Sequence, residues 1–185
     1  MRASLLAVLV IPACTGHLPD APPEEAVRPE VLFAGVGCGR GVLTFRNGAL
    51  DDAFTVTSRG RESEDGFVLD QTVRFGSGKV TERRWTMRPS GERTYEGTLT
   101  EASGPVKAVV AGGTLRLTYP MEDVPGGRMT QHLHLLDDGN VMNVATVTAF
   151  GIPVRRLSER IEPHVALEPD AEAACDSFED EGGPT

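Results

Sequence analysis

Apolar and polar residues alternate along most of this chain, between about residues 31 and 162. In residues 67–75 the odd positions are apolar except for Gln71, and the even positions are mostly polar. A period of two predicts half-buried β-strands. Asn47-Gly48 and the stretch 137–140 are strong hairpin-turn signals. The expected strands span residues 41–46, 54–59, 67–75, 80–88, 94–100, 106–111, 114–119, 129–136, 141–150 and 152–161.

The even spacing of these nine or ten short strands predicts the fold class. Hairpin connections between sequential strands favour an antiparallel meander, which avoids exposed edges best by closing into a barrel. We therefore expect an all-β, up-and-down barrel of about eight to ten strands, similar to lipocalins and other calycins. A two-sheet sandwich is the alternative. A barrel of this size has an interior that either is filled by side chains or holds one small ligand.

The first residues, MRASLLAVLVIPACTG, have the pattern of an export signal. Arg2 precedes a short apolar run, and small Ala13 precedes Cys14, as in bacterial lipoprotein signals. We expect a signal peptide over 1–13, lipidation at Cys14 and a proline-rich, extended tether over 14–30. This places the protein in the bacterial cell envelope, held by a lipid anchor. Thr15 follows the cysteine instead of aspartate, which favours the outer membrane, facing the periplasm.

Charge and cysteine content change this picture only at the C-terminus. The net charge is −9, but residues 168–185 contain seven acids and no base, which leaves −2 for the rest. We expect an acidic, disordered tail over 163–185 after a barrel domain over 31–162. Nothing resembles a basic nucleic-acid-binding face. In an exported chain Cys38 and Cys175 either form a disulfide or stay as two thiols, because spacing alone cannot fix pairing.

Short motifs from Gly37 to Glu162 resemble an uncharacterised family of proteobacterial lipoproteins, domain of unknown function family 3833. They are Gly39-Arg40-Gly41, 75–78 leading to Arg84-Trp85, Tyr95-x-Gly97, 135–139, and Asn143-x-Ala145 leading to Phe150-Gly151. The resemblance implies a lipocalin-type barrel with a calyx and no transferable activity. This chain has Val144 and Ala149 where the family tends to have basic residues.

Polar residues on otherwise apolar faces are the most informative candidates for a site. Gln71 and Gln131 each lie among apolar neighbours on one strand face, and buried amides need hydrogen-bond partners. Either they line a ligand cavity that is apolar with a few polar anchors, or they satisfy each other in a filled core. The candidate ligand-binding residues are Phe67, Gln71, Val73, Trp85, Tyr95, Leu117, Tyr119, Gln131, Leu133 and Asn143.

Three other features of the sequence do not indicate a functional site. His132 and His134 share a strand face, but a pair falls short of a zinc site, so we expect surface histidines, no metal and no cofactor. We expect cross-strand charge pairs on outer faces, in which Glu82 and Glu159 pair with Arg83, Arg84, Arg155 and Arg156. The glycines of 35–39 precede a strand and not a helix, so they indicate a bend with close backbone approach and no phosphate-binding loop.

The absence of a nucleophile–base constellation in this sequence argues against an enzyme. We expect an envelope lipoprotein that binds a lipid or another apolar small molecule. The alternative is a structural or interaction module of the envelope without a ligand.

Overall fold

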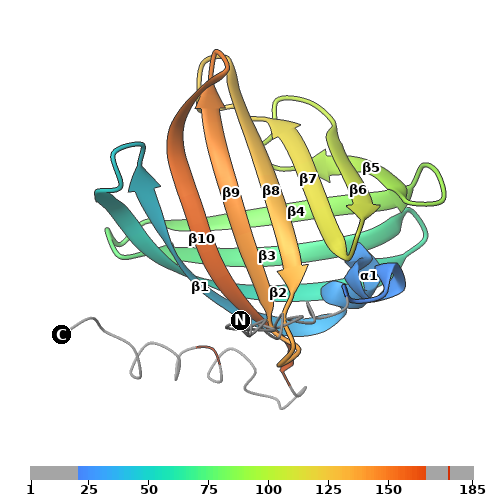
Figure 1. The fold of residues 1–185 in the computed structure, drawn as a ribbon. Helices are drawn as coiled ribbons and strands as arrows, with labels where there is room; N and C mark the ends of the chain where they lie inside the picture. The colour runs from blue at the N-terminus through green and yellow to red at the C-terminus, as the bar shows by residue number, and fades with distance from the viewer. Residues whose placement is uncertain (1–20, 166–174, 176–185) are drawn as a thin grey trace, which may run out of the picture.

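Ten antiparallel strands form a closed barrel in the computed structural model, which describes residues 21–165 and Cys175 (Figure 1). The predicted barrel is therefore confirmed, and the sandwich alternative is excluded. Two short helical segments precede the strands: η1 (Glu24–Val27) and α1 (Pro29–Leu32). The strands are β1 (Gly35–Phe45), β2 (Leu50–Ser63), β3 (Gly66–Phe75), β4 (Val80–Pro89), β5 (Thr94–Leu99), β6 (Val106–Ala111), β7 (Thr114–Pro120), β8 (Gly127–Leu135), β9 (Val141–Ala149) and β10 (Ile152–Val165).

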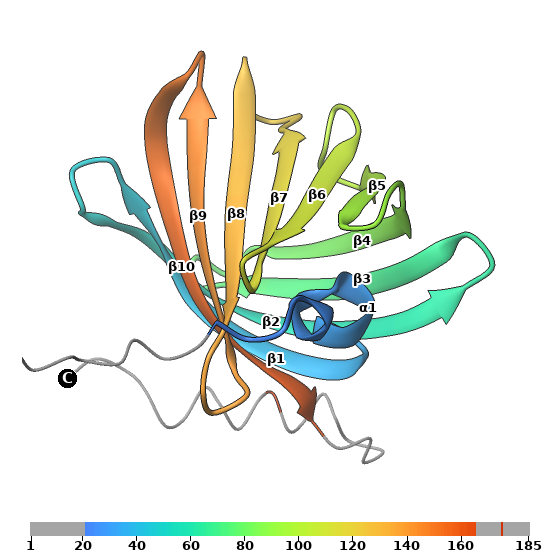
Figure 2. The same cartoon turned by 45° about the vertical axis from the view of Figure 1, so that its right-hand side comes forward.

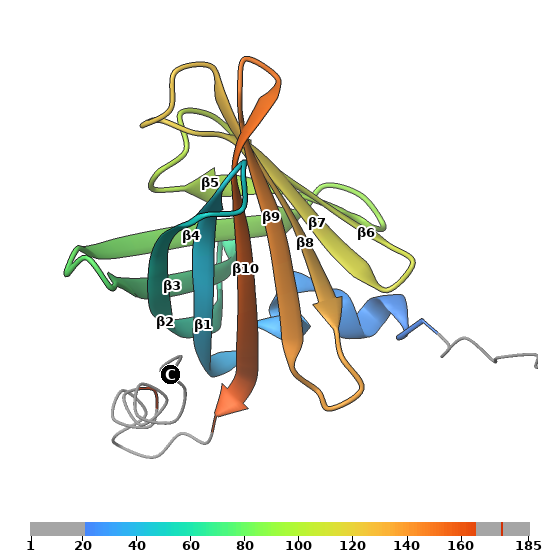
Figure 3. The same ribbon diagram turned by 60° about the vertical axis from the view of Figure 1, so that its left-hand side comes forward.

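Strand β1 closes the barrel because it pairs with β2 on one side and with β10 on the other (Figure 3). The stretch 35–39, predicted as a bend, is instead the first part of this strand. Its glycines do permit the predicted close approach. A Cβ at Gly39 would lie 2.5 Å from Glu159 Oε1, and one at Gly41 would lie 2.6 Å from Phe54 Cζ. Bare backbone in β1 thus leaves interior space for side chains from the strands beside it.

The alternation seen in the sequence becomes the division between the inside and the outside of the barrel. Leu69, Trp85, Leu117 and Leu133 are buried and belong to one apolar cluster in the interior. A second cluster forms around Phe54, at the end of the barrel where β1 passes into β2. Burial of these apolar faces is the main stabilising contribution, at about 25 cal/mol per Å² of apolar surface.

The helical segment covers one end of the barrel, which we call the capped end (Figure 2). Val27 and Leu32 are buried in the core cluster. Glu24 accepts hydrogen bonds from Arg93 Nη1 at 2.9 Å and from the Gly112 amide at 3.3 Å. Residues 24–30, expected to belong to an extended tether, therefore form part of the folded domain. Their few apolar residues suffice because the barrel end offers an apolar surface to bury them.

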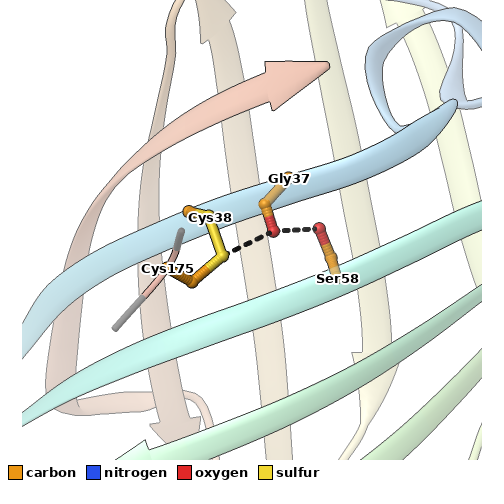
Figure 4. The surroundings of a disulfide bond; sticks show 4 residues. All are labelled: Gly37, Cys38, Ser58 and Cys175. Atoms are coloured by element: carbon orange, nitrogen blue, oxygen red, sulfur yellow. Dashed lines mark hydrogen bonds between the residues drawn. A yellow bond between two sulfur atoms is a disulfide. The ribbon is translucent and has the colours of Figure 1, made fainter. Parts of the chain in front are cut away.

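A disulfide joins Cys38 of β1 to Cys175, with 5.4 Å between the Cα atoms (Figure 4). The pairing that spacing left open is thus present. Next to it, Ser58 Oγ donates a hydrogen bond of 3.1 Å to the Gly37 carbonyl. The disulfide joins residues 137 positions apart in the sequence. Restricting an unfolded chain over a loop of this length stabilises the fold by about 5 kcal/mol.

Several predicted segments lie outside the described residues: the signal peptide over 1–13, the lipidated Cys14, the tether up to residue 20, and most of the acidic tail. The tail was expected to begin at 163, whereas β10 continues to Val165. Within residues 21–165 no helix is long and apolar enough to span a membrane.

We predict that Gly60→Ala destabilises the barrel and loosens its helical cap. The new Cβ would lie 1.7 Å from the Phe33 carbonyl oxygen and 2.6 Å from Phe67 Cζ, so the backbone after α1 must move. Overpacking of this kind costs about 1–3 kcal/mol. Urea unfolding measures the loss, and limited proteolysis within residues 21–33 detects the loosened cap.

Gly91→Ala is the matched control for this substitution. Its Cβ would meet only the hydroxyl oxygen of exposed Thr94, at 2.6 Å, and this hydroxyl can turn away. Equal stability and equal proteolysis of the two variants would show that the cap does not depend on close packing at Gly60.

Candidate functional site

The barrel interior contains a cavity of about 130 Å³. Its wall is mainly aliphatic and aromatic, with a small number of polar side chains. For comparison, an engineered apolar cavity of about 150 Å³ binds benzene. The cavity lining comprises Phe33, Leu43, Phe54, Val56, Leu69, Gln71, Val73, Phe75, Arg83, Trp85, Met87, Leu117, Met121, Val124, Met129, Gln131, Leu133, Asn143, Val147, Arg155, Leu157, Glu159 and Ile161.

The cavity is closed at the capped end and reaches solvent at the opposite end, which we call the open end. Phe33 and Met87 close the capped end, and both are buried. The partly exposed apolar lining residues, among them Leu43 and Phe75, lie on the opposite side, next to the turns that follow β1, β3, β7 and β9. A molecule would therefore enter the cavity at the open end, past mainly apolar side chains and the Arg155–Asp51 ion pair.

Exposed apolar side chains lie at this open end, at the turns after β1, β3 and β9, and form what we call the apolar rim. Phe150 is 79% exposed and has φ 51°, an uncommon backbone conformation for a non-glycine residue. It starts the tight turn to β10 together with Gly151, which also has positive φ. Such patches of exposed apolar side chains mark binding surfaces. The apolar rim consists of Phe45, Leu50, Val80, Phe150, Ile152 and Val154.

A chain of hydrogen-bonded polar side chains crosses the cavity wall from β10 to β7. Asn143 Nδ2 donates to Glu159 Oε2 at 2.9 Å and to Gln131 Oε1 at 3.2 Å. Gln131 Nε2 in turn donates to Tyr119 Oη at 3.0 Å, and burial raises the pKa of Tyr119 to about 12. The amides thus satisfy each other in part, as the filled-core hypothesis expected, although the core itself is hollow.

Two polar groups in this hydrogen-bond network are electrostatically unusual. Asn143 Oδ1 is buried and has no hydrogen-bond donor in the described part of the protein. A buried acceptor in this situation costs about 1–3 kcal/mol. The Glu159 carboxyl is buried as well, and this burial raises its pKa, opposed by the hydrogen bond from Asn143 and the charge of Arg83. The cavity wall therefore holds a carboxyl group that resists ionisation next to an unused acceptor.

Both arginines in the lining are already paired with carboxylates. Arg83 Nε lies 2.8 Å from Glu101 Oε2, an ion pair without hydrogen-bond geometry, and Arg155 Nε lies 2.7 Å from Asp51 Oδ2. Neither guanidinium is thus an unpaired cation facing the cavity. The polar surface available to a ligand consists mainly of neutral amides and the Glu159 carboxyl.

Seven of the ten candidate residues from the sequence line the cavity. They are Gln71, Val73, Trp85, Leu117, Gln131, Leu133 and Asn143. Gln71 Oε1 accepts a hydrogen bond of 2.7 Å from Trp85 Nε1, so these two side chains fix each other across β3 and β4. These seven side chains therefore lie together around one cavity, and their contact with a ligand stays a prediction.

The other three candidates lie outside the cavity lining. Phe67 packs beside Gly60 and Phe33, under the helical cap. Tyr95 Oη donates to Glu30 Oε1 of α1 at 3.1 Å, and burial, followed by the Glu30 charge, raises the pKa of Tyr95 to about 12. Tyr119 is buried in the core cluster without lining the cavity, and its ring packs edge-on against Trp85 at 5.4 Å between ring centroids. The unforeseen cap takes up the end of the barrel where Phe67 and Tyr95 lie.

Sequence reasoning placed three lining residues on the wrong face. Arg83, Arg155 and Glu159 were expected outside the barrel, but all three line the cavity. The alternation contained the necessary signal, because Arg83 shares a face with Trp85, and Glu159 lies between Leu157 and Ile161. The rule that charged residues are exposed outweighed this signal. Val144, by contrast, is 45% exposed on the outside, so the missing basic residue there does not affect the cavity.

The histidine pair shows no sign of a metal site. His132 and His134 stack at 6.4 Å between ring centroids on the outer face of β8. Burial and the neighbouring His134 and Arg116 charges lower the pKa of His132. Among the described residues no group of three or more histidine, cysteine, aspartate or glutamate side chains is placed to hold a metal ion.

Comparison with known proteins gives one family and two similar folds. The model of the family described as "Protein of unknown function (DUF3833)" matches residues 9–162. No curated protein matches the chain. An S-type phycobiliprotein lyase, CPES, from Guillardia theta superposes with a TM-score of 0.58 at 7% identity, covering 73% of this chain and 90% of the lyase. A protein of unknown function from the DUF3598 family of Nostoc punctiforme has a TM-score of 0.56 at 14% identity, covering 80% of this chain and 53% of that one.

We predict that Glu159→Gln makes the protein less sensitive to rising pH. A carboxyl with a pKa raised above its ordinary 4.5 binds more protons in the folded state than in the unfolded state. Its contribution to stability is therefore lost as pH rises through the folded-state pKa. Urea unfolding at pH 5 and pH 8 should show a smaller loss of stability for the variant than for the wild-type protein.

Glutamine can still accept the Asn143 hydrogen bond, so the comparison isolates the charge. The outer-face substitution Glu82→Gln on β4 is the control and should leave the pH dependence unchanged. Identical slopes for wild type and Glu159→Gln would contradict a raised pKa at Glu159.

Proposed function

We propose that this chain, which belongs to the DUF3833 family of proteins of unknown function, binds a small, mainly apolar molecule inside its barrel. The cavity of about 130 Å³ with its mainly apolar passage to the open end is the observation that carries the proposal. Protein interiors are normally close-packed, so an apolar cavity that reaches the surface is best explained by an occupant. The similar folds, at 7% and 14% identity, support the barrel alone and do not identify that occupant.

The size and lining of the cavity favour a slender ligand, and we propose a lipid with a single chain. Typical pockets for drug-sized ligands have volumes of about 300–1,000 Å³. The smaller volume here suits an unbranched alkyl chain, which gains about 0.8 kcal/mol for each buried CH₂ group. Chain segments that do not fit inside would lie against the apolar rim, where Phe45 and Phe150 are exposed.

We further propose that the protein is a lipid-anchored protein of the bacterial envelope, held at Cys14. The signal pattern MRASLLAVLVIPAC supports this proposal. Because residues 24–32 belong to the cap, the chain from Cys14 to Ala21 would span at most about 25 Å. Pro22 lies near Gly113 at the capped end, so the anchor would hold that end toward its membrane. The open end would then face away from the membrane that carries the anchor.

We predict that Leu43→Trp blocks ligand uptake, because Leu43 lines the cavity near the open end. The chain without lipid should bind a fluorescent fatty acid, and the purified protein should release lipid detectable by mass spectrometry of an organic extract. The variant should bind at least about tenfold more weakly, since tryptophan would fill the passage. Val42→Trp is the matched control, because Val42 is exposed on the outer face of the same strand.

Empty extracts together with no uptake of the fluorescent fatty acid would contradict lipid binding. Equal uptake by Leu43→Trp and Val42→Trp would place the binding site outside the barrel. The stability of both variants in urea confirms that they are folded.

The anchor has its own test, independent of the ligand. We predict that a bacterial host incorporates labelled palmitate into the full chain and that Cys14→Ser abolishes this labelling. The wild-type protein should partition into the detergent phase, and the variant should partition into the aqueous phase, because stable membrane attachment needs more than one acyl chain. Thr15→Ser is the control. A wild-type protein that is not labelled and partitions into the aqueous phase would contradict the proposed lipid anchor.

A further inference from the structure

Asn143, a residue of the cavity wall, has a buried acceptor that no donor among the described residues satisfies. The side chain is 4% exposed, and its Nδ2 group is fully occupied by Glu159 and Gln131. Its Oδ1 atom is buried without a donor among the described residues. Since Asn143 is part of the cavity wall, a molecule in the cavity can supply that donor. A ligand with a hydrogen-bond donor therefore satisfies an atom that an alkane or an ether leaves unsatisfied.

The Glu159 carboxyl lies beside this acceptor, because Asn143 Nδ2 is 2.9 Å from Glu159 Oε2. Gly39 leaves room for the carboxyl group, since a Cβ there would lie 2.5 Å from Oε1. In its protonated form the carboxyl group is a donor. One oxygen atom of a ligand can thus donate to Asn143 and accept from Glu159, which is the hydrogen-bonding pattern of a hydroxyl group.

The charges around the cavity disfavour a charged head group. An anion would be buried without an unpaired cation beside it, because Arg83 and Arg155 already lie next to Glu101 and Asp51. An ammonium group would have to be buried with an ionised Glu159, and each buried ion carries a desolvation penalty. A neutral donor avoids both costs.

We propose that Asn143 and Glu159 form the head-group site of the cavity and that they select an uncharged, hydroxyl-bearing amphiphile, such as a long-chain alcohol or a monoacylglycerol. This inference rests on the proposed binding of an apolar ligand in the barrel. The hydroxyl group lies at Asn143, and the alkyl chain runs toward Leu43 and the apolar rim. The small volume of the cavity then suits the head and the first part of the chain.

Four ligands with the same chain length test the selection: 1-decanol, 1-methoxydecane, decylamine and sodium decanoate. Each displaces the neutral fluorescent probe N-phenyl-1-naphthylamine from the full chain at pH 6.5. We expect decanol to bind about tenfold more tightly than the ether, which keeps the acceptor oxygen but lacks the donor. We also expect decanol to bind more tightly than the amine and the carboxylate.

Each other outcome has a definite consequence. Equal affinity of alcohol and ether, or tighter binding of either ion, overturns the head-group site and leaves apolar binding in the barrel intact. Failure of the probe and of all four ligands to bind overturns the proposed function together with this inference. The wild-type series decides between these outcomes without any variant.

Variants then locate the site. Asn143→Leu should bind the ether at least as well as the wild-type protein does, and its preference for decanol over the ether should disappear. Binding of the ether shows that this variant is folded. Val144→Leu, on the exposed outer face of the same strand, should keep the preference. An Asn143→Leu variant that still prefers the alcohol would overturn the assignment to Asn143.

Discussion

The structure depends on the pairing of β1 with both β2 and β10, because this pairing closes the barrel. Closure requires β1 to pass close to its neighbours, and Gly39 and Gly41 make that approach possible. A side chain at Gly39 would collide with Glu159, and one at Gly41 would collide with Phe54. The same glycines therefore serve two purposes. They allow the seam of the barrel to form, and they leave the interior space in which a buried carboxyl group can remain.

The strands could be predicted because their signal is local. Alternation and hairpin turns depend on neighbouring residues, so nine of the ten strands were expected within four residues of their actual bounds, whereas β1 begins six residues earlier than expected. The helical cap depends on a surface that exists only after the barrel has formed. Val27 and Leu32 are too few to suggest a packed segment from a proline-rich sequence, yet both are buried in the structure. Composition alone predicted an extended tether here, and packing against the barrel made residues 24–27 and 29–32 helical instead.

The central wall of the candidate site was also predictable, since Gln71 and Gln131 stood out on apolar faces. The hydrogen-bond partners were not, because pairing between Asn143 and Glu159 depends on register between β9 and β10. Register across a long barrel cannot be obtained from one sequence when both faces tolerate polar residues. From the sequence alone, a buried glutamate in a strand cannot be distinguished from an exposed one, because its hydrogen-bond partners are unknown. Glu159 was therefore assigned to the outer face.

The interior bears on the choice between a ligand-binding barrel and a purely structural module. A structural barrel gains most from apolar side chains that fill its core, because buried polar groups repay their desolvation only when they are fully hydrogen-bonded. This interior keeps a buried carboxyl group, an acceptor without a donor among the residues that the structure describes, and a cavity that is partly open. Each feature lowers the stability of the free protein. Together they support the proposed ligand, which would fill the cavity and supply the missing hydrogen bond, more than a structural module that needs neither.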